Sequence, residues 1–130
     1  MSLIRPLARG AVALAMLTAN VSAVFAQPGD MSVATFVTKA DALEAKGPLA
    51  MFSGDLKTVI GEVKASTAAY RVRLAAERAA GHPSSCVPQP VKLDSDQLRK
   101  FLKAIPAPAQ PRTTMRTAMA EYYIRTYPCK

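Results

Sequence analysis

Few residues in this chain of 130 are suited to chemistry, and the most distinctive of them are two cysteines. Cys86 stands in "SSCVPQP", Cys129 is next to the last residue in "TYPCK", and His82 is the single histidine. Two thiols can form a disulfide, bridge two chains, hold a metal together with a histidine, or act as a redox pair. Which chemistry applies depends on the compartment and on the elements that carry each thiol.

The remaining polar residues do not indicate a hydrolase site. His82 is followed closely by Ser84 and Ser85, but neighbours in sequence are not a catalytic triad, and no orienting acid is signalled. The acidic residues occur singly along the chain, and neither a glycine-rich phosphate loop nor a haem-attachment motif is present. We therefore expect a protein that is not an enzyme and needs no metal or cofactor, with His82 in an exposed loop.

The first 26 residues have the pattern of a secretory signal peptide. Arg5 and Arg9 precede a short apolar stretch that is followed by small residues, and no acidic residue occurs there. The stretch is too short to span a bilayer, for which about twenty apolar residues are needed. We expect cleavage between Ala26 and Gln27, with a weaker alternative after Ala23.

The expected organisation is thus a signal peptide over 1–26 and a single domain over 27–130, located in the periplasm without a stable membrane anchor. Loss of two of the 17 basic residues leaves 15 against 9 acidic ones, a net charge of about +6. Such a surface could meet an acidic protein or an anionic envelope polymer, or could simply be solvated. Aromatic residues are few and no groove-reading motif is present, so nucleic acid is not expected.

Apolar residues recur at helical spacing through the mature chain, which predicts an all-α fold. Ser32 is expected to cap a first helix that Gly47-Pro48 ends. A long helical region follows and extends to about Ala80. Ser53-Gly54 divides this region in two if Asp55 caps a second helix. Its apolar stripe, expected to lie in the core, consists of Phe52, Leu56, Val59, Ile60, Val63, Thr67, Tyr70 and Leu74.

Two shorter helices complete the predicted bundle. Asp94 and Gln97 form a capping-box pattern before a helix over 95–105, which a proline ends. The last helix is predicted over 113–127. We therefore expect a small bundle of four to five helices.

The two cysteines can be placed on these elements. The short proline-rich connection between 95–105 and 113–127 favours an antiparallel hairpin, and the longer last helix then brings Cys129 toward the loop that holds Cys86. In an oxidising compartment we expect a Cys86–Cys129 disulfide worth about 4 kcal/mol. Bridging between chains is the alternative, whereas a zinc site with His82 lacks a fourth ligand and a redox pair lacks the two-residue spacing.

The C-terminal half contains the segments "CVPQPVKLDSDQLRKFLKAIP" and "TAMAEYYIRTYPC". Their pattern resembles that of the Rap/Tai immunity proteins of type VI secretion. The matching positions are Cys86, Pro88, Gln97, Leu98, Phe101, Leu102, Pro106, Ala118, Tyr127, Pro128 and Cys129. The resemblance implies an exported, disulfide-bonded helical protein, often a homodimer, that binds a peptidoglycan amidase from a neighbouring cell and occludes its active site.

Three interpretations of function follow. Under the resemblance, the proline-rich loops 82–92 and 106–112 are expected to carry recognition, because exposed loops on a rigid scaffold commonly do. The alternative is a small periplasmic chaperone or stress protein, which binds many clients rather than one enzyme. A third interpretation is a module for anionic envelope polymer, with salt-sensitive contacts along one face of the long helix. That face carries Lys57, Lys64, Arg71 and Arg78.

Overall fold

The computed structural model of the chain describes residues 26–130, and this part contains four α-helices, two 3₁₀ turns and no β-strand. The helices are α1 (Val33–Lys46), α2 (Gly54–Ala79), α3 (Ser95–Ala104) and α4 (Met115–Thr126), and the turns are η1 (Gly47–Phe52) and η2 (Gln110–Arg112). The prediction of an all-α bundle is confirmed. None of the described helices is both long and apolar enough to cross a membrane.

The predicted signal peptide, 1–26, lies outside the described residues except for Ala26, which is exposed. Cleavage between Ala26 and Gln27 therefore stays a prediction.

Side-chain caps begin three helices, two of them at the residues that the sequence predicts, whereas α4 begins at Met115 and not at 113. Ser32, Asp94 and Thr114 are the N-cap residues of α1, α3 and α4, and their side-chain oxygens accept backbone N–H groups at 2.9 to 3.2 Å. Each bond satisfies a donor that the first helical turn would otherwise leave unpaired. These local bonds explain why the sequence locates the helix starts so well.

The predicted split of the long helical region at Ser53-Gly54 is confirmed. Gly47 ends α1 with a φ of 55°, and Pro48 opens the η1 turn that leads into α2. The expectation that Asp55 caps α2 is wrong, because Asp55 lies within the first turn and its carboxylate accepts a hydrogen bond from Lys39 at 2.6 Å. This ion pair joins α1 to α2 next to the corner that η1 forms.

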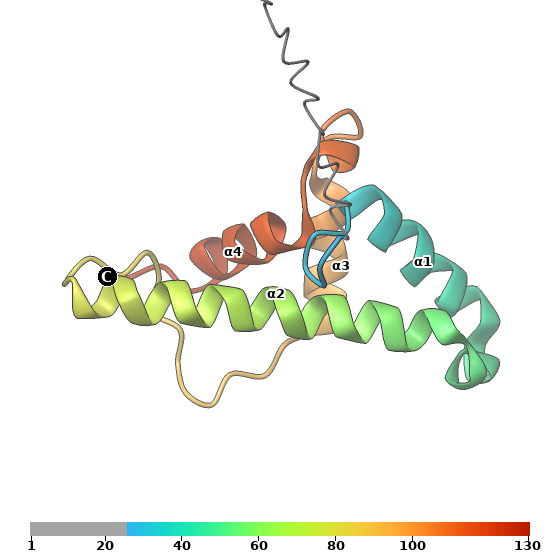
Figure 1. Cartoon of the computed structure of the whole chain (residues 1–130), viewed down its shortest axis with the longest axis horizontal. Coiled ribbons are helices and arrows are strands. Elements are labelled where there is room, and N and C mark those ends of the chain that lie inside the picture. Colours follow the sequence, from blue (N-terminus) through green and yellow to red (C-terminus); the bar gives the residue numbers. More distant parts are fainter. Residues whose placement is uncertain (1–25) are drawn as a thin grey trace, which may run out of the picture.

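Helix α4 lies along the second half of α2 and runs in the same direction, while α3 stands across them (Figure 1). The predicted antiparallel hairpin of α3 and α4 is wrong, because α4 makes its main contact with α2. Tyr70 of α2 stacks on Tyr123 of α4 with ring centroids 5.3 Å apart. Such a pair buries large apolar area, and the adjacent Leu74 extends it, so α2 offers α4 a larger apolar partner than the ten-residue α3 does.

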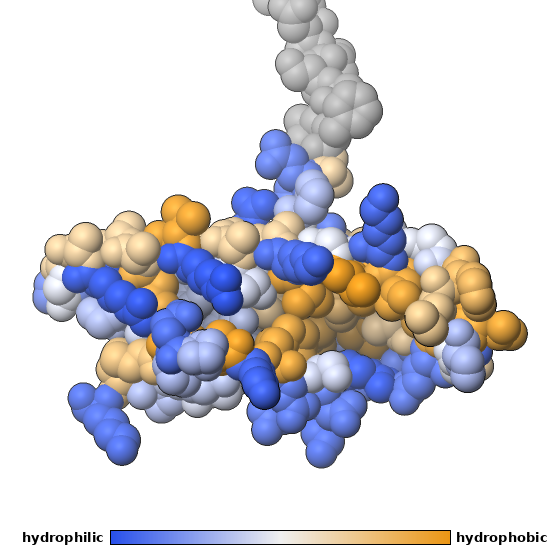
Figure 2. Space-filling view, turned by 90° about the horizontal axis from the view of Figure 1, so that it is seen from below, coloured by the Kyte–Doolittle hydropathy of each residue, from blue (hydrophilic) through white to orange (hydrophobic). Residues whose placement is uncertain are grey.

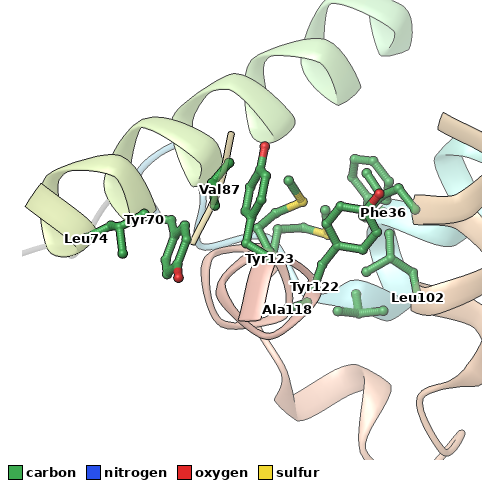
Figure 3. Close-up of a cluster of buried hydrophobic side chains, with 12 residues drawn as sticks. Phe36, Tyr70, Leu74, Val87, Leu102, Ala118, Tyr122 and Tyr123 are labelled. Carbon is green, nitrogen blue, oxygen red and sulfur yellow. The ribbon is translucent and has the colours of Figure 1, made fainter. Parts of the chain in front are cut away.

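A single cluster of buried side chains joins the four helices (Figure 3). Tyr123 lies on the side of α4 that faces α2, whereas Tyr122 lies toward Phe36 and Leu102. The cluster consists of Val33, Phe36, Tyr70, Leu74, Val87, Leu98, Leu102, Met115, Ala118, Met119, Tyr122 and Tyr123. Five of these residues belong to α4, so this helix is the centre of the core.

The apolar stripe of the long helical region is core only in its second half. Tyr70 and Leu74 are 3% and 4% exposed, but Phe52 is 88% and Ile60 is 43% exposed. Helix α4 covers the C-terminal half of α2, whereas α1 contacts the first half and meets it at η1 (Figure 1), so Val59 and Val63 are partly buried while Phe52 and Ile60 stay exposed. The buried residues of α2 occur at every fourth position, as Glu62, Ser66, Tyr70 and Leu74.

The segment that follows the predicted cleavage site is bound into the fold. The buried carboxylate of Glu62 accepts the N–H of Gly29 at 2.7 Å and that of Met31 at 3.4 Å. The carbonyls of Met31 and Gly29 in turn accept the N–H groups of Met115 and Arg116 at 2.8 and 2.9 Å. The segment thereby connects the middle of α2 to the start of α4.

Candidate interaction surface

The two cysteines form the predicted disulfide. The S–S distance of Cys86–Cys129 is 2.04 Å, the Cα atoms are 4.9 Å apart, and the bond closes 43 residues of sequence. The pairing arises because α2 and α4 run in the same direction, so the loop after α2 meets the end of α4. Since both sulfurs are joined to each other within one chain, the bridge between chains and the zinc and redox alternatives are excluded for this state of the protein.

A hydrogen-bond network fixes the loop that leads to Cys86. The Tyr70 hydroxyl lies 2.5 Å from the Ser85 Oγ and 3.0 Å from the Ser84 Oγ. The Glu77 carboxylate accepts the Ser84 N–H at 2.8 Å and pairs with Arg73 at 2.6 Å. Hydrogen bonds from Ser84 and then from Arg73 lower the pKa of Glu77 to about 2, because both stabilise its charged form. The disulfide end of the molecule is therefore held rigidly.

Ser85 lies close to His82 in the sequence, but the two side chains have different surroundings in the structure. Ser85 is fully buried and bonded to Tyr70, whereas His82 is exposed and donates its backbone N–H to the Glu77 carbonyl at 2.9 Å. In the described residues no group of three or more His, Cys, Asp or Glu side chains is arranged to hold a metal ion.

The two loops predicted to carry recognition do not lie together. Loop 82–92 lies beside the disulfide and the C-terminal end of α2, whereas 106–112 lies at the top of Figure 1 and packs against α1 through η2. A partner that contacts one loop therefore does not automatically contact the other.

Three of the exposed large apolar side chains lie together at the opposite end of the long axis, on η1. Leu49, Met51 and Phe52, together called the apolar tip below, are 69%, 79% and 88% exposed. Figure 1 places η1 at the corner between α1 and α2, and Figure 2 shows hydrophobic surface at the same end. Burying one such side chain in a partner stabilises a complex by about 1.5–3 kcal/mol. This tip is therefore the strongest candidate for a contact with another molecule.

A hollow of about 460 Å³ adjoins the apolar tip on α2. Its apolar lining comes from Met51, Leu56 and Ile60, and Lys57 and Lys64 border it. The tip and the hollow form a continuous apolar surface bordered by positive charge.

One ion pair and one hydrogen bond connect the segments on the two sides of the tip. Asp55 pairs with Lys39, and the Lys46 ammonium donates to the Ser53 Oγ at 3.2 Å. The hydrogen bond from Lys39 and its charge lower the pKa of Asp55 below its usual value. On the far side of α1, Asp41 accepts from Lys103 of α3 at 2.8 Å. The corner at η1 is thus fixed from both helices despite its exposure.

Sequence reasoning missed the apolar tip because it assigned Phe52 to the core stripe of a long helix. The signal was present in "GPLAMFSGD", where an apolar run lies between the Gly-Pro stop and the Ser-Gly break. Apolar residues between two helix boundaries belong to neither helix, so they have no helical face to direct them into the core.

Comparison with protein-family models, with curated proteins and with solved structures found no match to this chain.

Proposed function

We propose that the chain is an exported binding protein of the periplasm that resembles the Rap/Tai immunity proteins and inhibits a type VI secretion peptidoglycan amidase by occluding its active site. The observation that carries the proposal is the apolar tip, which projects from a rigid bundle and has no partner among the described residues. The Cys86–Cys129 disulfide supports an oxidising compartment, since such bonds rarely persist in the cytosol.

The mechanism is insertion of a rigid projection into a groove. Leu49, Met51 and Phe52 offer large apolar side chains within one short turn, and the pair of Lys39 with Asp55 fixes the helices on both sides of it. A projection that is ordered before binding loses little conformational entropy on binding, so more of the apolar contact appears as affinity. Occlusion requires no reacting group on this chain.

The alternative is a periplasmic chaperone or stress protein, and the same exposed apolar surface supports it. The two functions differ in the number of partners. An inhibitor binds one enzyme at a fixed ratio, whereas a chaperone binds many unfolded chains.

The test is affinity capture with the oxidised protein, recovered from the envelope of bacteria that export the full chain. The proposal predicts one peptidoglycan amidase at a fixed ratio, whose release of stem peptides from peptidoglycan stops when the protein is added. Capture of a broad set of clients would support the chaperone instead, and an amidase that stays active in the complex would refute occlusion.

Two variants locate the contact. Met51→Asp combined with Phe52→Asp places two charges on the apolar tip and should weaken the complex at least about tenfold, which corresponds to about 1.4 kcal/mol. Val72→Asp is the control for a charge on an exposed apolar side chain outside the tip, because Val72 is 74% exposed on α2. Equal loss from both variants would show that the tip is not the contact.

A further inference from the structure

A second surface, which is positively charged, runs along α2 and shares one hollow with the apolar tip. Lys57, Lys64, Arg71 and Arg78 follow one another at intervals of seven residues, and all four are exposed. At 1.5 Å per residue they span about 30 Å of the helix. We call these four cations, together with Gly61, Ala68 and Ala75 on the same side of the helix, the basic face.

The cations of the basic face lack acidic partners within residues 26–130. None of the four takes part in the ion pairs of this part of the chain, and Arg78 donates to the Val87 carbonyl at 3.4 Å. The remaining cation of α2, Arg73, differs because it pairs with Glu77. The positive charge of the face is therefore not neutralised by the fold.

Apolar hollows adjoin the cations at both ends of the face. Lys57 and Lys64 border the hollow of about 460 Å³ described above. Arg71 and Arg78 border a second hollow of about 200 Å³, whose apolar lining comes from Leu74, Val87, Val91 and Tyr123. Figure 2 shows hydrophilic residues spaced along the length of the molecule with hydrophobic surface between and beneath them. The face thus combines charge with apolar area.

The residues between the cations are small. Gly61, Ala68 and Ala75 each stand four residues after a cation of the basic face and three before the next. A Cβ added to Gly61 would have no atom within 4 Å, so the surface is open there. Residues at intervals of four and three lie on one side of a helix, and a second helix packed alongside presents its own residues at the same seven-residue period.

These observations favour one occupant over the others. A second copy of this chain would place its own four cations against the basic face, and like charges repel. An anionic polymer would satisfy the cations but would leave the apolar hollows unfilled. A helix with carboxylates at every seventh position and apolar residues between them complements both the charge and the hollows.

We propose that the basic face of α2 docks an acidic amphipathic helix of another protein, which lies alongside α2. This contact goes beyond inhibition through the apolar tip and does not depend on which enzyme the tip binds.

The probe is a synthetic helical peptide of about 25 residues, close to the length of α2. It carries Glu at every seventh position, Leu and Ile on the same side of the helix, and uncharged polar residues on the other side. A scrambled peptide of the same composition serves as its control. Fluorescence anisotropy with the oxidised, exported protein should show at least about tenfold tighter binding of the ordered peptide. Equal binding of the two peptides would overturn the proposal in favour of a general polyanion surface, and binding of neither would overturn it outright.

Charge reversal tests the location. Replacing Lys57, Lys64, Arg71 and Arg78 by Glu should weaken binding of the ordered peptide at least about tenfold. The matched control reverses Lys92, Lys100, Arg112 and Lys130, which are exposed cations elsewhere and carry the same total charge; it should change binding less than about threefold. Equal loss from both sets would overturn the proposal, because it would reflect net charge alone.

Gly61→Leu provides a test that does not depend on charge or on the folding of a fourfold variant. The new side chain meets open space within this chain, so the unfolding temperature should not fall, but it occupies the surface where the peptide must approach. Binding should weaken about tenfold, and unchanged binding would overturn the docking geometry.

Sedimentation of the wild-type protein completes the test. Self-association that the fourfold charge reversal abolishes would overturn the proposal and assign the basic face to a second copy of the chain.

Discussion

The two halves of α2 carry the same helical spacing of apolar residues but have opposite surroundings. The C-terminal half, with Tyr70 and Leu74, is covered by α4 and closed by the disulfide. In the N-terminal half, Ile60 and the adjoining tip residue Phe52 are exposed. Periodicity therefore identifies a helix face that favours burial, while the tertiary arrangement decides whether the chain itself buries that face or leaves it to a partner.

The largest effect is expected at the disulfide end. Replacing Cys86 and Cys129 together by Ser should lower the free energy of unfolding by about 4 kcal/mol, because the bond closes a loop of 43 residues. Urea denaturation followed by circular dichroism measures the change, and reduction of the wild-type protein should reproduce it. A loss below about 1 kcal/mol would mean that the loop is already held by its other contacts.

Two side-chain truncations on α2 compare the stability contributions of its two halves. Leu74→Ala removes a side chain that is 4% exposed and should cost about 2–5 kcal/mol. Ile60→Ala removes one that is 43% exposed and should cost less than about 1 kcal/mol. Equal costs in denaturation would show that Ile60 is covered in solution.

Two glycines give effects of opposite sign. Gly61→Ala should stabilise the protein by up to about 1 kcal/mol, because a helix interior favours Ala and the added Cβ meets nothing within 4 Å. Gly29→Ala should destabilise it, because Gly29 has a φ of 99° and its Cβ would lie 3.3 Å from the Arg116 guanidinium. Thermal unfolding of the two variants should therefore move in opposite directions, and a shift in one direction would contradict this geometry.

The smallest expected effect is on the pH dependence of the unfolding free energy, compared between a carboxylate at each end of α2. The folded pKa of Glu77 is lowered to about 2, so its contribution to stability is present above its ordinary pKa near 4.5 and is lost as the pH falls toward 2. Glu77→Gln should flatten the fall of the unfolding free energy over this window. Asp55→Asn, which removes a carboxylate of lowered pKa near the tip, is the matched comparison. An unchanged slope in both variants would show that other groups dominate acid unfolding.

Local signals allowed much of the fold to be predicted from the sequence. The caps Ser32 and Asp94 and the break at Ser53-Gly54 act through neighbouring backbone groups, so they can be read without tertiary structure. The Cys86–Cys129 pairing was also predicted, although through a hairpin that does not form. It held because the end of α4 reaches the same loop by lying along α2.

The remaining features depend on contacts between distant segments. Burial of Glu62 requires the backbone N–H groups of Gly29 and Met31, which are more than thirty residues away. The spacing of apolar residues does not predict this contact. Likewise, α4 begins beside the middle of α2 and therefore does not reach the apolar tip, a placement that the spacing of apolar residues does not encode. The apolar run of the tip can be seen in the sequence, but its exposure follows only from the placement of the helices.

The central claim is that the rigid apolar tip closes the active site of an amidase, and one titration tests it most directly. The exported, oxidised protein is added to the captured amidase while the release of stem peptides from peptidoglycan is followed. The account predicts that activity falls to zero at a fixed protein-to-enzyme ratio and that the Met51→Asp, Phe52→Asp variant requires at least about tenfold more protein. Full amidase activity with wild-type protein in excess would contradict it.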